Sequence, residues 1–358
     1  MPKDNHMYEL EYPGPALDTG DAAGGLSMVV ALQGYADAGH GVQQAGQHLL
    51  QALNHSPVAN FNVDELIDYR SRRPGVTIDS GQVVDREDLS ITLHRVEDTD
   101  GRPFLLLTGP EPDLRWEAFS KAVAELATRT NVERTITLYA APMTVPHTRP
   151  LVVSAHSSDQ SLTEEMRAWT SRMIIPGAAA LDIELLLSRR GLTTVGLTAH
   201  VPHYIAASDY PEATYGLLHT VEKVAELSLP LRALQADMDK VRQQLAEQVD
   251  DSAEIASVVG ALERQYDEEM ARIRRKTENA LLAPGEEIPS GDEISAEFER
   301  FLAEAAESDG MDATDAADNA GDNAGDNAGD NAGDNAGDTD SDSTDSTDTD
   351  SDPTDTDR

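Results

Sequence analysis

The chain has 358 residues, a formal net charge of −39 and no cysteine. This length allows one large domain or two smaller ones. The absence of cysteine excludes a disulfide framework, a thiolate nucleophile and cysteine-ligated zinc, and is typical of a reducing compartment. The negative charge argues against nucleic acid or an anionic membrane as a partner. Because no apolar run approaches the roughly 18 residues of a membrane span and no secretory signal is recognisable, we expect a cytoplasmic protein.

Residues 8–228 alternate between strand-like and helix-like patterns. Apolar runs predict strands at 28–32, 58–63, 89–96, 104–108, 135–140, 151–155 and 194–199. Helical spacing predicts helices at 42–53, 113–128, 179–190 and 211–227. Asp113 is the expected N-cap of the second helix, and Gly191 is the expected stop of the third. Strands separated by helices predict an α/β core domain, with a mainly parallel sheet covered on both faces.

Residues 229–304 have a different pattern. Apolar residues recur at alternating steps of three and four from Leu227 to Leu245 and again from Ile255 to Ile273, which predicts two amphipathic helices packed as a hairpin. Asp251 and Glu254 resemble a capping box at the start of the second helix. A short helix at 295–303 follows. Two interpretations of the hairpin are equally open. It could be a structural appendage, or it could be an arm that binds a partner or forms an oligomer.

Residues 305–358 form an acidic, low-complexity tail. A four-residue repeat that begins at Asp318-Asn319-Ala320-Gly321 leads into a run of Ser, Thr and Asp. Without large apolar residues to offset the ordering entropy, we expect this tail to be disordered. Its spacing does not match an EF-hand loop, which favours a solvating role over specific calcium binding.

Four loops after predicted strands carry the polar residues of interest: 34–41, 109–116, 143–150 and 200–204. The carboxyl ends of parallel strands meet at one edge of a sheet, so we expect these loops to lie together there. The candidate ligand-binding residues are Gly34, Asp37, Gly39, Glu111, Arg115, His147, Arg149 and His203.

Each candidate also has a purely structural interpretation. Backbone amides in the first loop could hold an anion, although its spacing fits neither nucleotide-binding glycine motif, and Asp37 could instead cap the next helix. Glu111 and Arg115 could bind a polar ligand, or they could form an ion pair with each other. His147 is a candidate acid or base and Arg149 a candidate anion clamp, in a loop that equally suits a subunit contact. His200 and His203 lack a third ligand of suitable spacing, so we expect no metal.

The residue pattern also argues against several reactions. No G-x-S-x-G nucleophile elbow is present. All but one of the five lysines lie on predicted helices, and neither phosphate-directed basic side chains nor paired carboxylates for magnesium are apparent. The sequence therefore predicts no cofactor and assigns no catalytic residue.

As a set, these four loops resemble the proteasome assembly chaperone 2 family, specifically its actinobacterial branch. The likeness is carried by Gly34-Tyr35-Ala36-Asp37-Ala38-Gly39, by Gly109-Pro110-Glu111-Pro112 with Arg115-Trp116, by Val145-Pro146-His147-Thr148-Arg149-Pro150 and by Val201-Pro202-His203-Tyr204. Ser295–Leu302, which contains Glu297-Phe298-Glu299-Arg300-Phe301-Leu302, resembles the usual close of the family's domain, so the likeness covers about residues 8 to 304.

The resemblance implies a three-layer α/β/α core similar to nucleoside phosphorylases and a homo-oligomer, in the form of a trimer. It further implies a non-enzymatic assembly chaperone or scaffold with proteasome subunits as partners. The alternatives are a small-molecule-binding protein or enzyme of the nucleoside phosphorylase type, and an ATP-dependent carboxylate–amine ligase. The sequence ends Thr356-Asp357-Arg358 rather than in the hydrophobic-tyrosine-any signal that such chaperones often insert into an α-ring, so a proteasome contact would use another surface.

Overall fold

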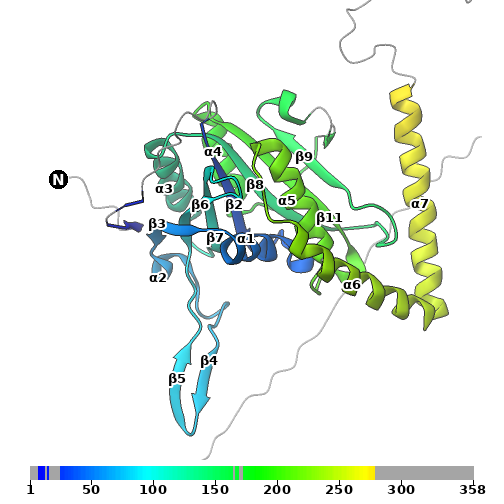
Figure 1. Cartoon of the computed structure of the whole chain (residues 1–358), viewed down its shortest axis with the longest axis horizontal. Coiled ribbons are helices and arrows are strands. Elements are labelled where there is room, and N and C mark those ends of the chain that lie inside the picture. The colour runs from blue at the N-terminus through cyan, green and yellow to red at the C-terminus, as the bar shows by residue number, and fades with distance from the viewer. Residues whose placement is uncertain (1–6, 13, 16–24, 164–165, 169–171, 279–358) are drawn as a thin grey trace, which may run out of the picture. The chain divides into compact units, whose positions relative to one another are not determined.

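The computed structural model describes residues 7–12, 14–15, 25–163, 166–168 and 172–278 (Figure 1). The predicted helix at 295–303 and the acidic tail at 305–358 lie outside these residues. The strands are β1 (Tyr8–Leu10), β2 (Leu26–Gln33), β3 (His55–Phe61), β4 (Val76–Asp79), β5 (Gln82–Arg86), β6 (Thr92–Glu97), β7 (Pro103–Pro110), β8 (Val132–Met143), β9 (Val153–Ser157), β10 (Arg167–Ala168) and β11 (Thr193–Pro202). The α-helices are α1 (Gly41–Ala52), α2 (Val63–Leu66), α3 (Trp116–Arg129), α4 (Ala179–Arg189), α5 (Pro211–Ala225), α6 (Arg232–Asp250) and α7 (Ala253–Glu278).

Nine strands form one sheet in the order β1-β3-β6-β7-β2-β8-β11-β9-β10. The central strands β7, β2, β8 and β11 are parallel to one another, which confirms the predicted α/β fold. Antiparallel pairings flank this centre, with β6 against β7 on one side and β9 against β11 on the other. The parallel centre brings the carboxyl ends of β2, β7, β8 and β11 to a common edge, where the four candidate loops begin.

Helices cover both faces of this sheet. The side chains of β2 show this, because they alternate between two apolar clusters, one on each face. Met28 and Val30 pack in the cluster that contains residues of α3 and α4, whereas Val29 and Ala31 pack in the cluster that contains residues of α1 and α5. All four of these side chains are at most 2% exposed. The uninterrupted apolar run therefore forms a strand buried on both faces, as expected of a central parallel strand.

Two predicted helix caps are wrong, and a third boundary is right. Helix α3 begins at Trp116 rather than at Asp113, because Arg115 adopts a left-handed φ of 60° that the helix cannot extend through. Helix α7 is capped by the Ser252 hydroxyl, which accepts a hydrogen bond from the Ile255 amide at 3.3 Å, and not by Asp251. Gly191 does end α4, with a φ of 82°.

A small hairpin made by β4 and β5 was not predicted. It pairs β4 with β5 in a separate two-stranded sheet, and it projects from the rest of the described fold (Figure 1). Ser80 and Gly81 connect the strands with φ values of 50° and 81°, as a tight hairpin turn requires. All nine residues of its strands are exposed, so none of them contributes to the core.

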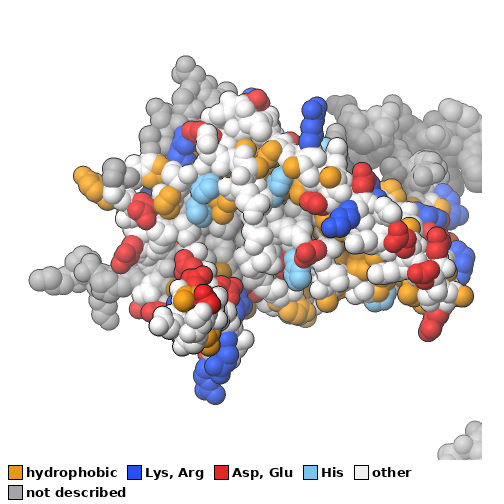
Figure 2. Space-filling view, turned by 60° about the horizontal axis from the view of Figure 1, so that its bottom comes forward, with side chains coloured by type: hydrophobic (Ala, Val, Ile, Leu, Met, Phe, Trp, Pro, Cys, Tyr) orange, Lys and Arg blue, Asp and Glu red, His pale blue; other side chains and the backbone are white. Residues whose placement is uncertain are grey.

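Helices α6 and α7 form the predicted helical hairpin. Leu234 and Met238 of α6 and Val259 and Leu262 of α7 are the buried apolar residues of this hairpin, each at most 8% exposed. Acidic and basic side chains are mixed over the region of these helices in Figure 2, as expected of a solvated surface. Within the described ranges, no helix is long and apolar enough to cross a membrane. The proposed domain boundary at residue 228 stays a prediction.

Candidate functional site

The structure joins the four candidate loops by direct contacts. The amide of Gly39 donates to the carbonyl of Ala206, just after the fourth loop, at 2.7 Å. The His147 amide donates to the Tyr204 hydroxyl at 2.9 Å, which links the third loop to the fourth. The Tyr35 amide donates to Glu111 at 3.2 Å, which links the first loop to the second. The predicted common edge is therefore present, and we refer to these four loops as the loop edge.

Glu111 connects the second loop to the first loop and to helix α4. Its side chain is buried, and its carboxylate accepts hydrogen bonds from the amides of Tyr35 and of Ala179, the latter at 2.7 Å at the start of α4. It passes so close to Gly34 that a Cβ there would lie 2.1 Å from the Glu111 Oε2 atom. Glycine at position 34 thus makes room for a carboxylate of the protein itself.

Asp37 caps helix α1, which is the structural alternative raised by the sequence. Its carboxylate accepts hydrogen bonds from the amides of Val42 at 2.7 Å and Gln43 at 3.2 Å. Burial raises the pKa of Asp37, and these two amide bonds oppose the rise. The neighbouring Gly39 has a φ of 67°, and a Cβ there would lie 2.8 Å from the Cβ of Tyr210. The first loop is shaped by its own packing and capping.

His147 pairs with the fourth loop. Its Nδ1 atom lies 2.7 Å from the Tyr204 hydroxyl, and its amide donates to the same oxygen at 2.9 Å. Burial lowers the pKa of His147. The ring of His203 packs edge-on against Tyr204, with ring centroids 5.5 Å apart. One histidine from the third loop and one from the fourth therefore contact the same tyrosine.

Arg149 faces helix α7. Its guanidinium makes two bonds to the Asp267 carboxylate, at 2.8 Å from Nε and 2.7 Å from Nη2, and a third to Glu263 at 3.1 Å. The hydrogen bond with Asp267 raises the pKa of Arg149 and lowers that of Asp267. Two carboxylates thus already occupy the predicted anion clamp. Arg115 is similarly paired, with Glu65 rather than with Glu111.

A buried polar cluster on β8, β9 and α4 was not foreseen from the sequence pattern. The Tyr139 hydroxyl donates to Glu184 Oε1 at 2.6 Å, and His156 Nε2 lies 2.9 Å from Glu184 Oε2. Tyr139 and Glu184 are 5% and 6% exposed. We call these three residues the Tyr-Glu-His cluster. It spans β8, β9 and α4, so only the fold brings it together.

Electrostatics in the Tyr-Glu-His cluster favour a neutral tyrosine and a protonated histidine. Burial, and then the charge of Glu184, raise the pKa of Tyr139 well above its ordinary value. The hydrogen bond with Glu184 raises the pKa of His156 against the opposing effect of burial. The His156 ring lies over Gly196, where a Cβ would approach it to 2.1 Å. Its position thus requires glycine on the neighbouring strand.

An apolar cavity of about 520 Å³ adjoins this cluster, and we call it the Tyr35 cavity. Its lining includes Tyr35, Tyr139, Met143, His156, Ile175 and Leu181. Tyr35 is 70% exposed and Ile175 is 57% exposed. The cavity therefore combines an apolar wall with the two polar side chains that Glu184 holds.

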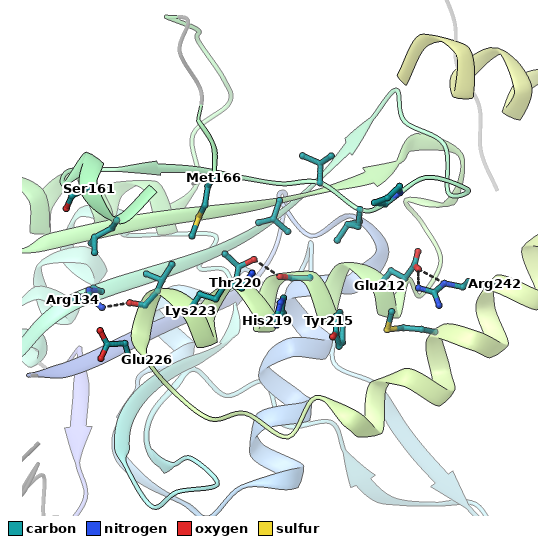
Figure 3. Close-up of a pocket in the computed structure, with 18 residues that line it drawn as sticks. Arg134, Ser161, Met166, Glu212, Tyr215, His219, Thr220, Lys223, Glu226 and Arg242 are labelled. Atoms are coloured by element: carbon teal, nitrogen blue, oxygen red, sulfur yellow. Dashed lines mark hydrogen bonds and ion pairs between the residues drawn. The ribbon is translucent and has the colours of Figure 1, made fainter. Parts of the chain in front are cut away.

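A second cavity, of about 810 Å³, lies between α5, α6 and β9 (Figure 3). Three of its charged side chains are used within the protein, since Arg242 pairs with Glu212 and Arg134 donates to the Val224 carbonyl. None of the candidate site residues lines it. Among the residues that the structure describes, no group of three or more His, Cys, Asp or Glu side chains is placed to hold a metal ion.

Together, the fold and the loop edge define an α/β protein with a mainly parallel sheet and a C-terminal helical hairpin. The model of the PAC2 family matches residues 31–249, and the chain belongs to this family. None of the curated proteins compared with the chain matches it.

Several solved structures are similar to this one. A Corynebacterium glutamicum protein of unknown function is 54% identical, with a TM-score of 0.73, over 75% of this chain and 99% of that chain. A Mycobacterium tuberculosis protein of unknown function is 44% identical, with a TM-score of 0.73, over 75% of this chain and 94% of that chain. A proteasome-assembly chaperone homologue from M. tuberculosis is 26% identical, with a TM-score of 0.61, over 65% of this chain and 100% of that chain.

Proposed function

We propose that this chain is a non-enzymatic assembly chaperone or scaffold that binds proteasome subunits. Family membership supports a chaperone-like role, and a relative of similar fold is described as a proteasome-assembly chaperone homologue. The observation that carries the proposal is that polar side chains of the loop edge are bonded to other groups of the protein. Asp37, Glu111 and Arg149 bond to the protein's own backbone and carboxylates, which leaves them occupied in holding loops together.

The enzymatic alternatives would draw on the same residues. A phosphorylase-type enzyme would use Asp37, Glu111, His147 and Arg149 to bind and polarise its substrate. To do so, it would have to break a helix cap, a loop-to-helix link and a three-bond contact with α7. A binding role needs no such rearrangement.

The β4–β5 hairpin is the surface on which we expect a protein partner. Val76, Ile78 and Val83 are 52%, 69% and 70% exposed, and Ile78 pairs across the hairpin with Val83. The hairpin comes forward at the lower left of Figure 2, with apolar atoms among charged ones. A two-stranded hairpin is marginally stable alone, and a partner that covers its apolar face would stabilise it.

The test is a binding experiment with the full-length protein and purified α-subunits of an actinobacterial proteasome. We expect co-elution in size-exclusion chromatography and a change in the rate of α-ring formation. Ile78→Asp should weaken co-elution, whereas the adjacent exposed change Thr77→Asp should not. The proposal is wrong if the α-subunits neither co-elute with the wild-type chain nor change their rate of assembly in its presence.

A further inference from the structure

The Tyr35 cavity has the size and composition of a small-molecule site. Its volume of about 520 Å³ lies within the range of about 300–1,000 Å³ that is typical of ligand pockets. Such pockets combine mostly apolar walls with a few polar groups that fix the ligand's orientation. Here Met143, Ile175 and Leu181 belong to the apolar wall, while His156 and Thr198 are polar lining residues.

The buried carboxylate beneath this cavity needs an explanation. Glu184 lies on α4 beside Ile183 and near Leu187, which are both fully buried. An apolar side chain of similar volume at position 184 would be expected to give an equally stable or more stable core, because burying a carboxylate is costly. The carboxylate therefore does something that packing alone does not require.

Glu184 holds a proton on Nε2 of His156 and fixes the orientation of the imidazole ring. It engages Nε2 of the imidazole at 2.9 Å and holds the Tyr139 hydroxyl on its other oxygen at 2.6 Å. Both carboxylate oxygens are thereby used within the protein. Nδ1 of His156 has no hydrogen-bond partner among the residues that the structure describes. His156 lines the cavity, and in the protonated ring, the form that Glu184 favours, Nδ1 is a hydrogen-bond donor.

This arrangement selects one ligand chemistry. The wall favours an apolar body, and the polar anchor is a donor on a cationic ring, which pairs best with an anionic oxygen. An amine would find no carboxylate acceptor, because Glu184 is already engaged by two groups. We infer that the Tyr35 cavity binds a small apolar carboxylic acid, whose body lies against Ile175 and Leu181 and whose carboxylate accepts a hydrogen bond from Nδ1 of His156. This binding goes beyond the proposed scaffold role and does not depend on it.

The experiment is calorimetric titration of the full-length protein with decanoate, decan-1-ol and decylamine, each below its micellar concentration. We expect saturable binding of decanoate at one site per chain. Decanol should bind at least about tenfold more weakly, because it lacks the charge-assisted hydrogen bond, and decylamine more weakly still. The inference is overturned if decanoate shows no saturable binding or binds no tighter than decanol.

Variants locate the site and separate anchoring from folding. Ile175→Asp should abolish decanoate binding, whereas Ile174→Asp should preserve it, because Ile174 is 96% exposed and does not line the cavity. His156→Gln should remove the preference for decanoate over decanol while decanol still binds. Equal effects of the two isoleucine changes, or an unchanged preference in His156→Gln, would also overturn the inference. If His156→Gln does not fold, the ligand series on the wild-type chain decides.

Discussion

The loop edge and the Tyr-Glu-His cluster beside it are two halves of one region, and they use polar side chains in different ways. In the first half, which we call the closed half, His147 and Arg149 contact Tyr204 and helix α7 through exposed or half-exposed bonds. In the other, which we call the open half, Glu184 is buried beneath a cavity and holds Tyr139 and His156. Carboxylate, tyrosine and histidine side chains thus form exposed contacts in the closed half, whereas in the open half they form a buried, hydrogen-bonded cluster next to a cavity.

The difference matters energetically because exposure sets the strength of an ion pair. Arg149 and Asp267 have side chains that are 30% and 54% exposed, and exposed pairs of this kind contribute little net stability. The side chain of Glu184 is 8% exposed and that of His156 is 38% exposed. Because Tyr139, the other partner of Glu184, is buried as well, removing the carboxylate breaks a buried network, which costs about 3–5 kcal/mol. The closed half should therefore tolerate substitution, and the open half should not.

The largest expected effect is that of Glu184→Ala. It leaves the Tyr139 hydroxyl and His156 Nε2 without their acceptor, and we expect a loss of about 3–5 kcal/mol in the free energy of unfolding. Urea denaturation measures it. Glu184→Gln is the control, since it keeps the volume and one acceptor oxygen, and it should cost clearly less. A loss below about 1 kcal/mol in Glu184→Ala would show that the buried cluster is no stronger than a surface pair.

Glu111→Ala should be the next most costly change. It removes the acceptor of the Ala179 and Tyr35 amides, and an unsatisfied buried donor costs about 1–3 kcal/mol. Glu117→Ala on α3 is the matched control, because the Glu117 side chain is 89% exposed. It should change the free energy of unfolding by no more than about 0.5 kcal/mol. Equal unfolding free energies for the two variants would contradict a structural role for Glu111.

The two halves should also respond to pH with opposite signs. The pKa of His156 is raised by Glu184, so its stabilising contribution is fully present below pH ~6.5 and is lost as pH rises through the folded-state pKa. The pKa of His147 is lowered by burial. The unfolded state then binds more protons, so stability falls as pH drops below ~6.5.

Urea unfolding between pH ~5 and ~8.5 tests this contrast. His156→Gln should flatten the loss of stability on the alkaline side, and His147→Gln should flatten the loss on the acid side. Each variant serves as the control for the other. Slopes that change in the same direction in both variants would contradict the assignment of opposite environments.

The smallest expected effect is that of Arg149→Met. We expect only a slight loss in the free energy of unfolding, which shrinks as salt is added because salt screens exposed charges. Hydrogen exchange should nevertheless accelerate at 145–150, because three bonds to α7 are lost. Arg272→Met, on helix α7, is the control, since the Arg272 side chain is 74% exposed and pairs with Glu269 one turn away on the same helix. Unchanged exchange at 145–150 would mean that α7 does not hold this loop.

Much of the fold follows from hydrophobic patterning, because burial on two faces leaves continuous apolar runs such as 28–32. The β4–β5 hairpin was missed because its strands face no core. The turn residues Ser80-Gly81 between Val76-Thr77-Ile78 and Val83-Val84 were the available signal. The cap at Asp113 failed because a left-handed residue, Arg115, intervenes before the helix.

The candidate site could be predicted only in part. The parallel sheet predicted that the four loops would meet, but not that Glu111 would bond to Ala179 or Arg149 to α7, since these partners lie far along the chain. The Tyr-Glu-His cluster joins residues on three separate elements. Its signal in the sequence was a single charge, Glu184, inside the otherwise apolar stretch Ile183–Leu187, because a buried carboxylate requires partners.

We claim that the open half binds a ligand and that the closed half only holds the fold together. The most direct measurement is the shift in Tm of wild-type, Ile175→Asp and Arg149→Met chains with decanoate, and with nucleoside plus phosphate or ATP. We predict a shift with decanoate alone, lost in Ile175→Asp and retained in Arg149→Met. A saturable shift with nucleoside and phosphate or with ATP, lost in Arg149→Met, would contradict the claim.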